Sequence, residues 1–158
     1  MKRRRELELV YRSHGPSVVR RARAILGDEA EAREVLQELF AGFVAEPEPL
    51  LGARSVVGFL YQATTHRCLN KLRNARNRRR LVEARAMELA PPPAGSSPEV
   101  RTLAHDALLQ LDDESAKAAI YRHVDGMTHA EIAALLGCSR RHVGNLLQRL
   151  GAEGNPTP

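Results

Sequence analysis

Residues 127–150, MTHAEIAALLGCSRRHVGNLLQRL, decide the fold of this chain. The first half predicts a short helix, because Thr128 and Glu131 have the spacing of a capping box, in which a hydroxyl and a carboxylate satisfy free N–H groups of the first turn. Gly137 favours the left-handed conformation that ends such a helix, and Ser139 is a suitable N-cap for the next one. The stretch therefore predicts two short helices joined by a tight turn.

The second of these helices has an apolar and a polar face. Its apolar residues have the i, i+3, i+4, i+7 spacing of one helical stripe, and they are Val143, Leu146, Leu147 and Leu150. The polar face offers donors and acceptors suited to base edges in the major groove. These candidate DNA-binding residues are Arg140, Arg141, His142, Asn145, Gln148 and Arg149. The whole is a helix-turn-helix pattern. An amphipathic hairpin whose basic face meets only water is the alternative.

Composition narrows the class of protein and of partner. The 158 residues suffice for one domain or two small ones, and 43% of them are hydrophobic, which is enough for a folded core. Aromatic residues make up only 4%, with no Trp, which disfavours binding to rows of stacked bases. The net charge of +5 suits a polyanionic partner.

Several other classes are disfavoured. Cys68 and Cys138 lie far apart without a metal-ligand spacing, so we expect two buried thiols and no disulfide. No histidine pair, phosphate-binding loop or nucleophile–base set is present, so we expect no catalytic residue, no metal and no cofactor. The N-terminal MKRRR precedes no apolar run, and no stretch approaches the ~20 apolar residues of a membrane span. We therefore expect a cytoplasmic protein without membrane contact.

Helical periodicity extends through the rest of the chain, with no strand-like alternation. A first helix is expected at 6–26, open to a break at Gly15-Pro16, and a second from 32 to 44, ended by Pro47 and Pro49. A third begins near Val56, and two more are expected at 100–111 and about 114–124.

The stretch APPPAGSSP, residues 90–98, has the composition of a linker and divides these helices into two groups. The expected fold is therefore all-α, with two small helical domains joined by a flexible linker. The expected boundaries are 1–85 for the first domain, 86–99 for the linker, 100–151 for the second domain and 152–158 for a disordered tail.

Two charged faces belong to the first domain. The second helix exposes an edge at spacings of three and four, formed by Glu31, Glu34, Gln37 and Glu38. The third helix has a polar face with Gln62, His66, Arg67, Asn70, Lys71 and Arg73, and a basic run follows with Arg76, Arg78, Arg79 and Arg80. Such a run is either a solvated helix end or a nucleic-acid contact.

With both halves in view, the chain resembles the sigma factors of bacterial RNA polymerase, in particular the short extracytoplasmic-function group of the sigma-70 family. AREVLQELF, residues 32–40, resembles the family's A-E-D-L-V-Q-E-V-F segment. GFLYQATTHRCLNKLRNARNRR, residues 58–79, resembles its A-W-L-Y-R-I-A-R-N-L-A-L-D-H-L-R-R-R-R segment, and YRHVDGMTHAEIAALLGCS, residues 121–139, resembles L-R-Y-V-E-G-L-S-Y-E-E-I-A-E-I-L-G-I-S. The resemblance covers residues from about 9 to 150.

The resemblance implies a transcription initiation factor, with catalysis left to the polymerase. Its first domain, region two, would dock on the clamp helices of the polymerase β′ subunit and melt the −10 promoter element. Its second, region four, would read the −35 element and contact the β flap. Polymerase docking would fall to Glu31, Glu34, Gln37 and Glu38, and the −10 element to His66, Arg67, Asn70, Lys71, Arg73 and Arg76. An anti-sigma factor is a further partner that the resemblance allows, and no small-molecule substrate is implied.

The chain departs from the family pattern at five positions. Phe59 stands where the family often has Trp, His66 at an Asn and Asn70 at an Asp, which leaves the −10 sequence open. Gly144 stands where Lys is frequent and Leu146 where Arg is frequent, which predicts a weaker hold on phosphates. Gly144 also costs roughly 1 kcal/mol against Ala in a helix interior.

Two other functions remain. The first is a helix-turn-helix regulator that acts without polymerase, which leaves the acidic edge and the linker unexplained. The second is a protein-interaction module, such as a sigma-like decoy, which the departures at Gly144 and Leu146 favour. Binding to core polymerase separates a sigma factor from the regulator, and absence of a specific DNA site would indicate the decoy.

Overall fold

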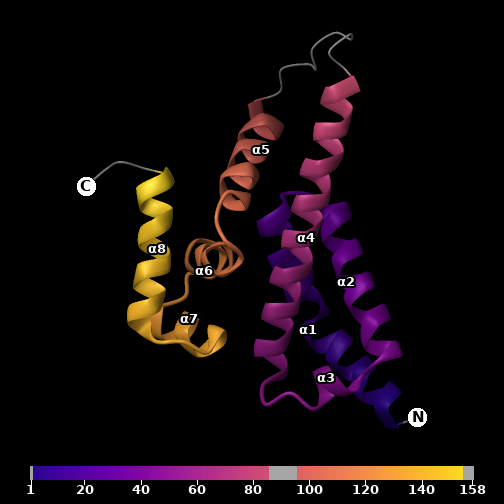
Figure 1. Ribbon diagram of the computed structural model, residues 1–158. Helices are drawn as coiled ribbons and strands as arrows, with labels where there is room; N and C mark the ends of the chain where they lie inside the picture. The colour runs from indigo at the N-terminus through magenta and orange to yellow at the C-terminus, as the bar shows by residue number, and fades with distance from the viewer. Residues whose placement is uncertain (1, 86–95, 155–158) are drawn as a thin grey trace.

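The computed structural model describes residues 2–85 and 96–154, and this part of the chain is built from helices without a strand (Figure 1). The expected all-α class is therefore confirmed. In chain order the helices are α1 Lys2–Leu26, α2 Glu29–Ala45, α3 Glu48–Leu51, α4 Val56–Arg85, α5 Ser96–Leu109, α6 Asp113–His123, α7 His129–Leu136 and α8 Arg140–Gly154.

Helix α1 begins four residues before the expected start and continues through Gly15 and Pro16, so the break that the sequence allowed does not occur. A proline inside a helix removes one backbone hydrogen bond and crowds the preceding turn. Burial offsets that cost here, because Gly15 is buried against α2, where an added Cβ would lie 3.7 Å from Leu36. Tertiary packing therefore overrides the local signal.

The junctions that follow are set by local chemistry. Gly27 has a φ of 76° and ends α1, and the Asp28 carboxylate caps α2 by accepting a hydrogen bond from the Ala30 N–H. The short helix α3 was not predicted. It begins directly after Pro47 and has Pro49 in its first turn, where a missing N–H loses no helical partner.

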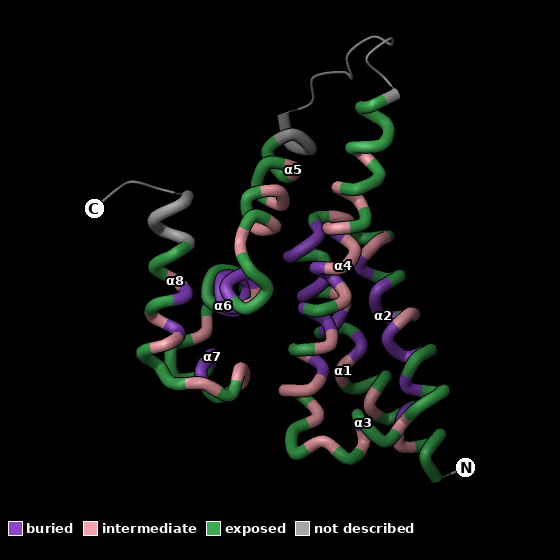
Figure 2. The backbone as a smooth tube through the Cα atoms, viewed as in Figure 1, coloured by how far each residue is buried: buried purple, intermediate pink, exposed green. Residues whose placement is uncertain are grey.

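The core of the first domain lies among α1, α2 and α4, whose facing stripes are buried (Figure 2). The buried apolar residues of α1 include Val18, Ala22, Ile25 and Leu26, and those of α2 include Val35, Leu36, Leu39, Phe40 and Phe43. Val44 is an exception: it continues the apolar pattern of α2 but is 69% exposed.

The second domain contains the predicted helix-turn-helix, α7 and α8. Both hydrogen bonds of the capping box are present, at 3.1 Å from the Glu131 N–H to the Thr128 hydroxyl and 3.0 Å from the Thr128 N–H to the Glu131 carboxylate. Gly137 ends α7 with a φ of 72°. The buried cluster beneath joins Val143 and Leu146 of α8 to residues of α6 and α7, namely Ala118, Tyr121, Ile132 and Ala133.

Two helices extend into segments that were expected to be linker or tail. Helix α5 begins at Ser96, inside the stretch expected to be linker, and places Pro98 in its first turn, where proline is tolerated. Helix α8 continues to Gly154, into the stretch expected to be a tail. The rest of the expected linker, 86–95, and of the expected tail, 155–158, lies outside the described residues.

The two groups of helices pack against each other. Ala116 and Ile120 of α6 belong to the same buried cluster as the core of the first domain, and Leu108 and Leu109 of α5 pack against it. In Figure 1, α5 and α6 lie beside α4, while α8 lies on the side of the molecule away from α1 to α4. This contact between the domains was not predicted.

Candidate nucleic-acid interface

Helix α8 presents most of its candidate DNA-binding residues to solvent. Arg140, Arg141, Asn145, Gln148 and Arg149 are exposed. Two members of the predicted set are also held by carboxylates at the beginning of α6. His142 Nε2 lies 3.0 Å from Glu114 Oε1, and Arg149 donates to Asp112 Oδ2 at 2.8 Å. The pKa of Asp112 is lowered mainly by its hydrogen bonds from Ser115 and also by Arg149. A phosphate would have to displace these carboxylates.

The two departures in α8 have different structural meanings. Leu146 is 1% exposed and lies in the core of the second domain, so its position cannot serve a phosphate contact without unpacking that core. The lack of a cation at Leu146 therefore follows from the packing of this helix, and the weaker hold on phosphates stays a prediction. Gly144 is half-buried, and an added Cβ would meet no atom within 4 Å. Of these two positions, Gly144 is the one with open space for a side chain to begin.

The candidate −10 residues of α4 do not form one continuous surface. His66 and Asn70 bond to each other, with Asn70 Nδ2 3.3 Å from His66 Nε2. Arg67 and Lys71 turn toward α2, and Arg73 turns toward the second domain, where it pairs with Asp113. Arg76 is half-buried, and its Nε has no hydrogen-bond partner among the residues that the structure describes.

The acidic edge of α2 lies beside α4. Glu34 and Gln37 are exposed, and Glu31 and Glu38 are half-exposed. Lys71 Nζ lies 3.1 Å from both Glu34 Oε2 and Glu38 Oε1, and Arg67 lies 3.6 Å from Glu38. Burial alone would lower the pKa of Lys71, but its hydrogen bonds to Glu34 and Glu38 raise it. The expected acidic edge and two of the expected DNA-contacting cations therefore neutralise each other in this structure.

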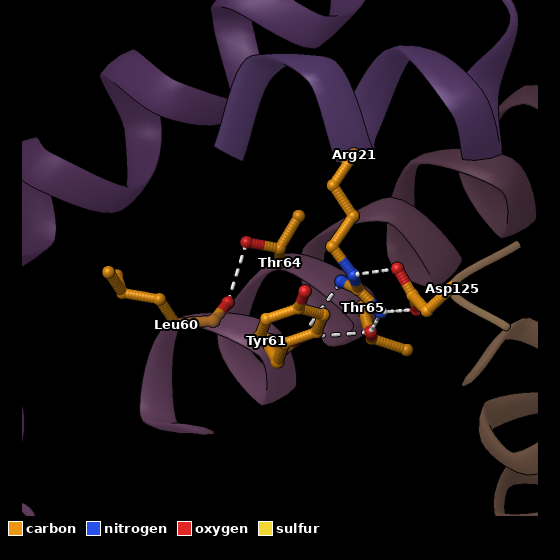
Figure 3. Close-up of polar contacts among 6 residues, drawn as sticks. All are labelled: Arg21, Leu60, Tyr61, Thr64, Thr65 and Asp125. Carbon is orange, nitrogen blue, oxygen red and sulfur yellow. Dashed lines mark hydrogen bonds and ion pairs between the residues drawn. The ribbon is translucent and has the colours of Figure 1, made fainter. Parts of the chain in front are cut away.

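Sequence reasoning missed an arginine at the boundary between the domains. Arg21 forms a two-pronged contact with Asp125, from Nε to Oδ1 at 2.9 Å and from the second terminal nitrogen to Oδ2 at 2.7 Å (Figure 3). Arg21 also donates to the Tyr61 carbonyl at 3.0 Å and to the Thr65 hydroxyl at 2.7 Å. A signal existed, because Arg21 shares the apolar face of Val18 and Ile25 at helical spacing, and a charge on a buried face needs a partner.

The cysteines and acidic groups give no sign of another site. Both cysteines are free thiols, and burial raises the pKa of Cys68 to about 12. Over residues 2–85 and 96–154, no three His, Cys, Asp or Glu side chains are grouped to hold a metal ion. None of the described helices is both long enough and apolar enough to cross a membrane.

Comparison with known families matches both halves of the chain. The family model described as Sigma-70 region 2 matches residues 10–78, and the one described as Sigma-70, region 4 matches residues 101–150. The first match covers α1 to α4 except their ends, and the second covers the helix-turn-helix with α6 and most of α5. A search of curated proteins found no significant match to the chain.

Proposed function

The chain belongs to the sigma-70 family of transcription initiation factors, and we propose that it is a member of the extracytoplasmic-function group that brings core RNA polymerase to its promoters. The observation that carries this proposal is the order of the two matched regions, 10–78 and 101–150, with only a short segment between them. That interval is too short for an intervening domain, and domains of fewer than about 40 residues seldom fold alone. Its site of action would be the cytoplasm, where polymerase and DNA meet.

Within this proposal the second domain, residues 100–151, reads the −35 element. Recognition helices of this motif place their first turns in the major groove. Arg141 and Asn145 are exposed, four residues apart and near the start of α8, which suits base contacts. Arg140 and Gln148 would support them, while His142 and Arg149 would exchange their carboxylate partners for phosphates.

The first domain, residues 1–85, would handle the −10 element through α4. The six assigned residues are His66, Arg67, Asn70, Lys71, Arg73 and Arg76. His66 and Asn70 are available at the surface as a hydrogen-bonded pair. Arg67 and Lys71 would be released when another cation takes over Glu34 and Glu38, which links polymerase docking to DNA contact through shared charges.

The polymerase surface would be the edge of Glu31, Glu34, Gln37 and Glu38, facing the β′ clamp helices, with the β flap as a partner of the second domain. The support is electrostatic, since an acidic edge suits a basic partner helix and like charges across an interface cost several kcal/mol. The double variant Glu34→Lys with Glu38→Lys should therefore lose co-elution with core polymerase.

A matched control reverses two exposed carboxylates elsewhere in the same domain, Glu8→Lys with Glu46→Lys, and should bind core as wild type does. Circular dichroism checks folding, because reversal also breaks the ion pairs with Lys71. If the folded Glu34/Glu38 variant still binds core, the docking assignment fails. If wild type never binds core, a regulator that acts without polymerase becomes the better function.

A further inference from the structure

The C-terminal half of α4 is held by carboxylates of the second domain. Arg73 pairs with Asp113 at the start of α6, and Arg79 pairs with Asp106 of α5 through two contacts at 2.8 and 3.3 Å. The hydrogen bond from Arg79 holds the pKa of Asp106 below its usual value. Arg73 and Arg79 extend the same basic run from which α4 would contact phosphates, so the two carboxylates occupy positions that a nucleic acid would need.

A buried charge pair fixes where the second domain sits. The Arg21 and Asp125 side chains are only 7% and 8% exposed. The Arg21 guanidinium lies 4.5 Å from the Tyr61 ring centroid of its own domain and 5.4 Å from that of Tyr121 in the other. A pair buried in this way adds little net stability, but loss of one partner leaves an uncompensated charge. The pair therefore selects this one arrangement of the domains.

Backbone carbonyls complete the interface. Gln62 donates to the Leu135 carbonyl at 2.6 Å, and Arg101 donates to the Gly27 carbonyl, also at 2.6 Å. His105 Nε2 lies 2.9 Å from the Ile25 carbonyl, at the end of α1. The contacts thus run from Gln62 near the beginning of α4 to Arg79 near its end.

We propose that the second domain is an internal ligand of α4 that competes with single-stranded nucleic acid, with Asp106 and Asp113 taking the place of backbone phosphates. The inference rests on the proposed function, since it assumes that α4 contacts the −10 strand. Helix α8 lies on the side of the molecule away from α4 (Figure 1), and its Arg140, Arg141 and Asn145 are exposed. The free protein would therefore keep these duplex-reading residues accessible while the strand-binding side of α4 is covered.

The test opens the interface in the full chain with Asp125→Asn, which leaves every proposed DNA and polymerase contact intact. Binding to a fluorescent single-stranded oligonucleotide of mixed sequence is measured by anisotropy, and compactness by small-angle X-ray scattering. If the covered state holds about nine-tenths of the molecules, opening it raises the apparent affinity roughly tenfold. We expect that gain together with a larger radius of gyration.

The control Glu8→Gln removes the same charge from an exposed site of α1 and should change neither quantity. Adding Arg73→Ala to Asp125→Asn should abolish most of the gain in oligonucleotide affinity, because that gain comes from phosphate contacts of the freed Arg73. Should Asp125→Asn fail to fold, Asp106→Asn with Asp113→Asn tests the same competition at more exposed carboxylates.

Unchanged affinity and unchanged radius of gyration in the folded variants would overturn the inference, as would a gain equal to that of Glu8→Gln. Core polymerase is absent from these measurements, so the proposed function is judged separately. If the variants gain strand binding but wild type does not bind core polymerase, the inference about this interface is supported and the sigma role is rejected. If wild type binds core polymerase but the variants gain no strand binding, the sigma role is supported and the inference about this interface is rejected.

Discussion

At the scale of single residues, Gly137 and Gly144 of the helix-turn-helix differ in backbone conformation. An added Cβ meets no atom within 4 Å at either position, but Gly137 has a φ of 72° whereas Gly144 lies inside α8. Space is therefore not the reason for glycine at either site. The left-handed backbone is a reason at Gly137, and nothing in the structure explains glycine at Gly144.

This contrast gives a prediction for stability. Gly144→Ala should stabilise the chain by up to about 1 kcal/mol, the difference in helix propensity between the two residues. Gly137→Ala should destabilise it by about 1–2 kcal/mol, because a Cβ is strained in the left-handed region. Urea unfolding of the full chain measures both. A destabilised Gly144→Ala variant would mean that α8 needs its backbone exposed or bent at this point.

At the scale of the element, α8 combines a buried apolar stripe with an exposed polar face. Substitutions in the stripe should affect folding, whereas substitutions on the polar face should affect binding. Val143 and Leu146 are buried, so they carry the fold of the second domain. Arg141 and Asn145 are exposed on the other side, so their removal should leave the fold intact.

Replacing Arg141 or Asn145 with Ala should therefore weaken binding to the cognate upstream element by about 1–3 kcal/mol and relax its sequence preference. Footprinting and competition with mutated sites would show this. Arg4→Ala removes the same charge from an exposed position of α1 and should have no such effect. Unchanged footprints and an unchanged sequence preference would reject the assignment of these residues to base contacts.

At the scale of the whole molecule, the chain consists of two helical groups that share a buried cluster. The two groups are therefore connected by side-chain packing as well as by the polypeptide between them. Noncovalent contacts also join the groups, through the buried side chains of Ala116 and Ile120 and through the Arg21–Asp125 pair.

Limited proteolysis tests this arrangement. We expect the first cut within 90–98, a Pro-rich stretch between the helical groups. The two fragments should then elute together in gel filtration and separate when Asp125→Asn is introduced. Early cuts within α4 or α6 would contradict the domain division, and separation of the wild-type fragments would show that the interface depends on the linker.

Much of the local structure could be predicted from the sequence alone. The capping box of Thr128 and Glu131, the stop at Gly137 and the apolar stripe of α2 depend on residues within one or two turns of each other. Helical period and cap chemistry act over that range whatever the rest of the chain does. The same local patterns carried the family resemblance, and the helix-turn-helix was recognised from them.

Only the tertiary structure decided the rest, because it depended on partners distant in sequence. Pro16 remains helical because Gly15, directly before it, is buried against Leu36 of α2. Arg21 and Asp125 are 104 residues apart, and no periodic pattern links positions at that distance. A charged residue on an apolar helix face indicates that an oppositely charged partner is needed. Which carboxylate becomes that partner is determined by how the helices dock against one another.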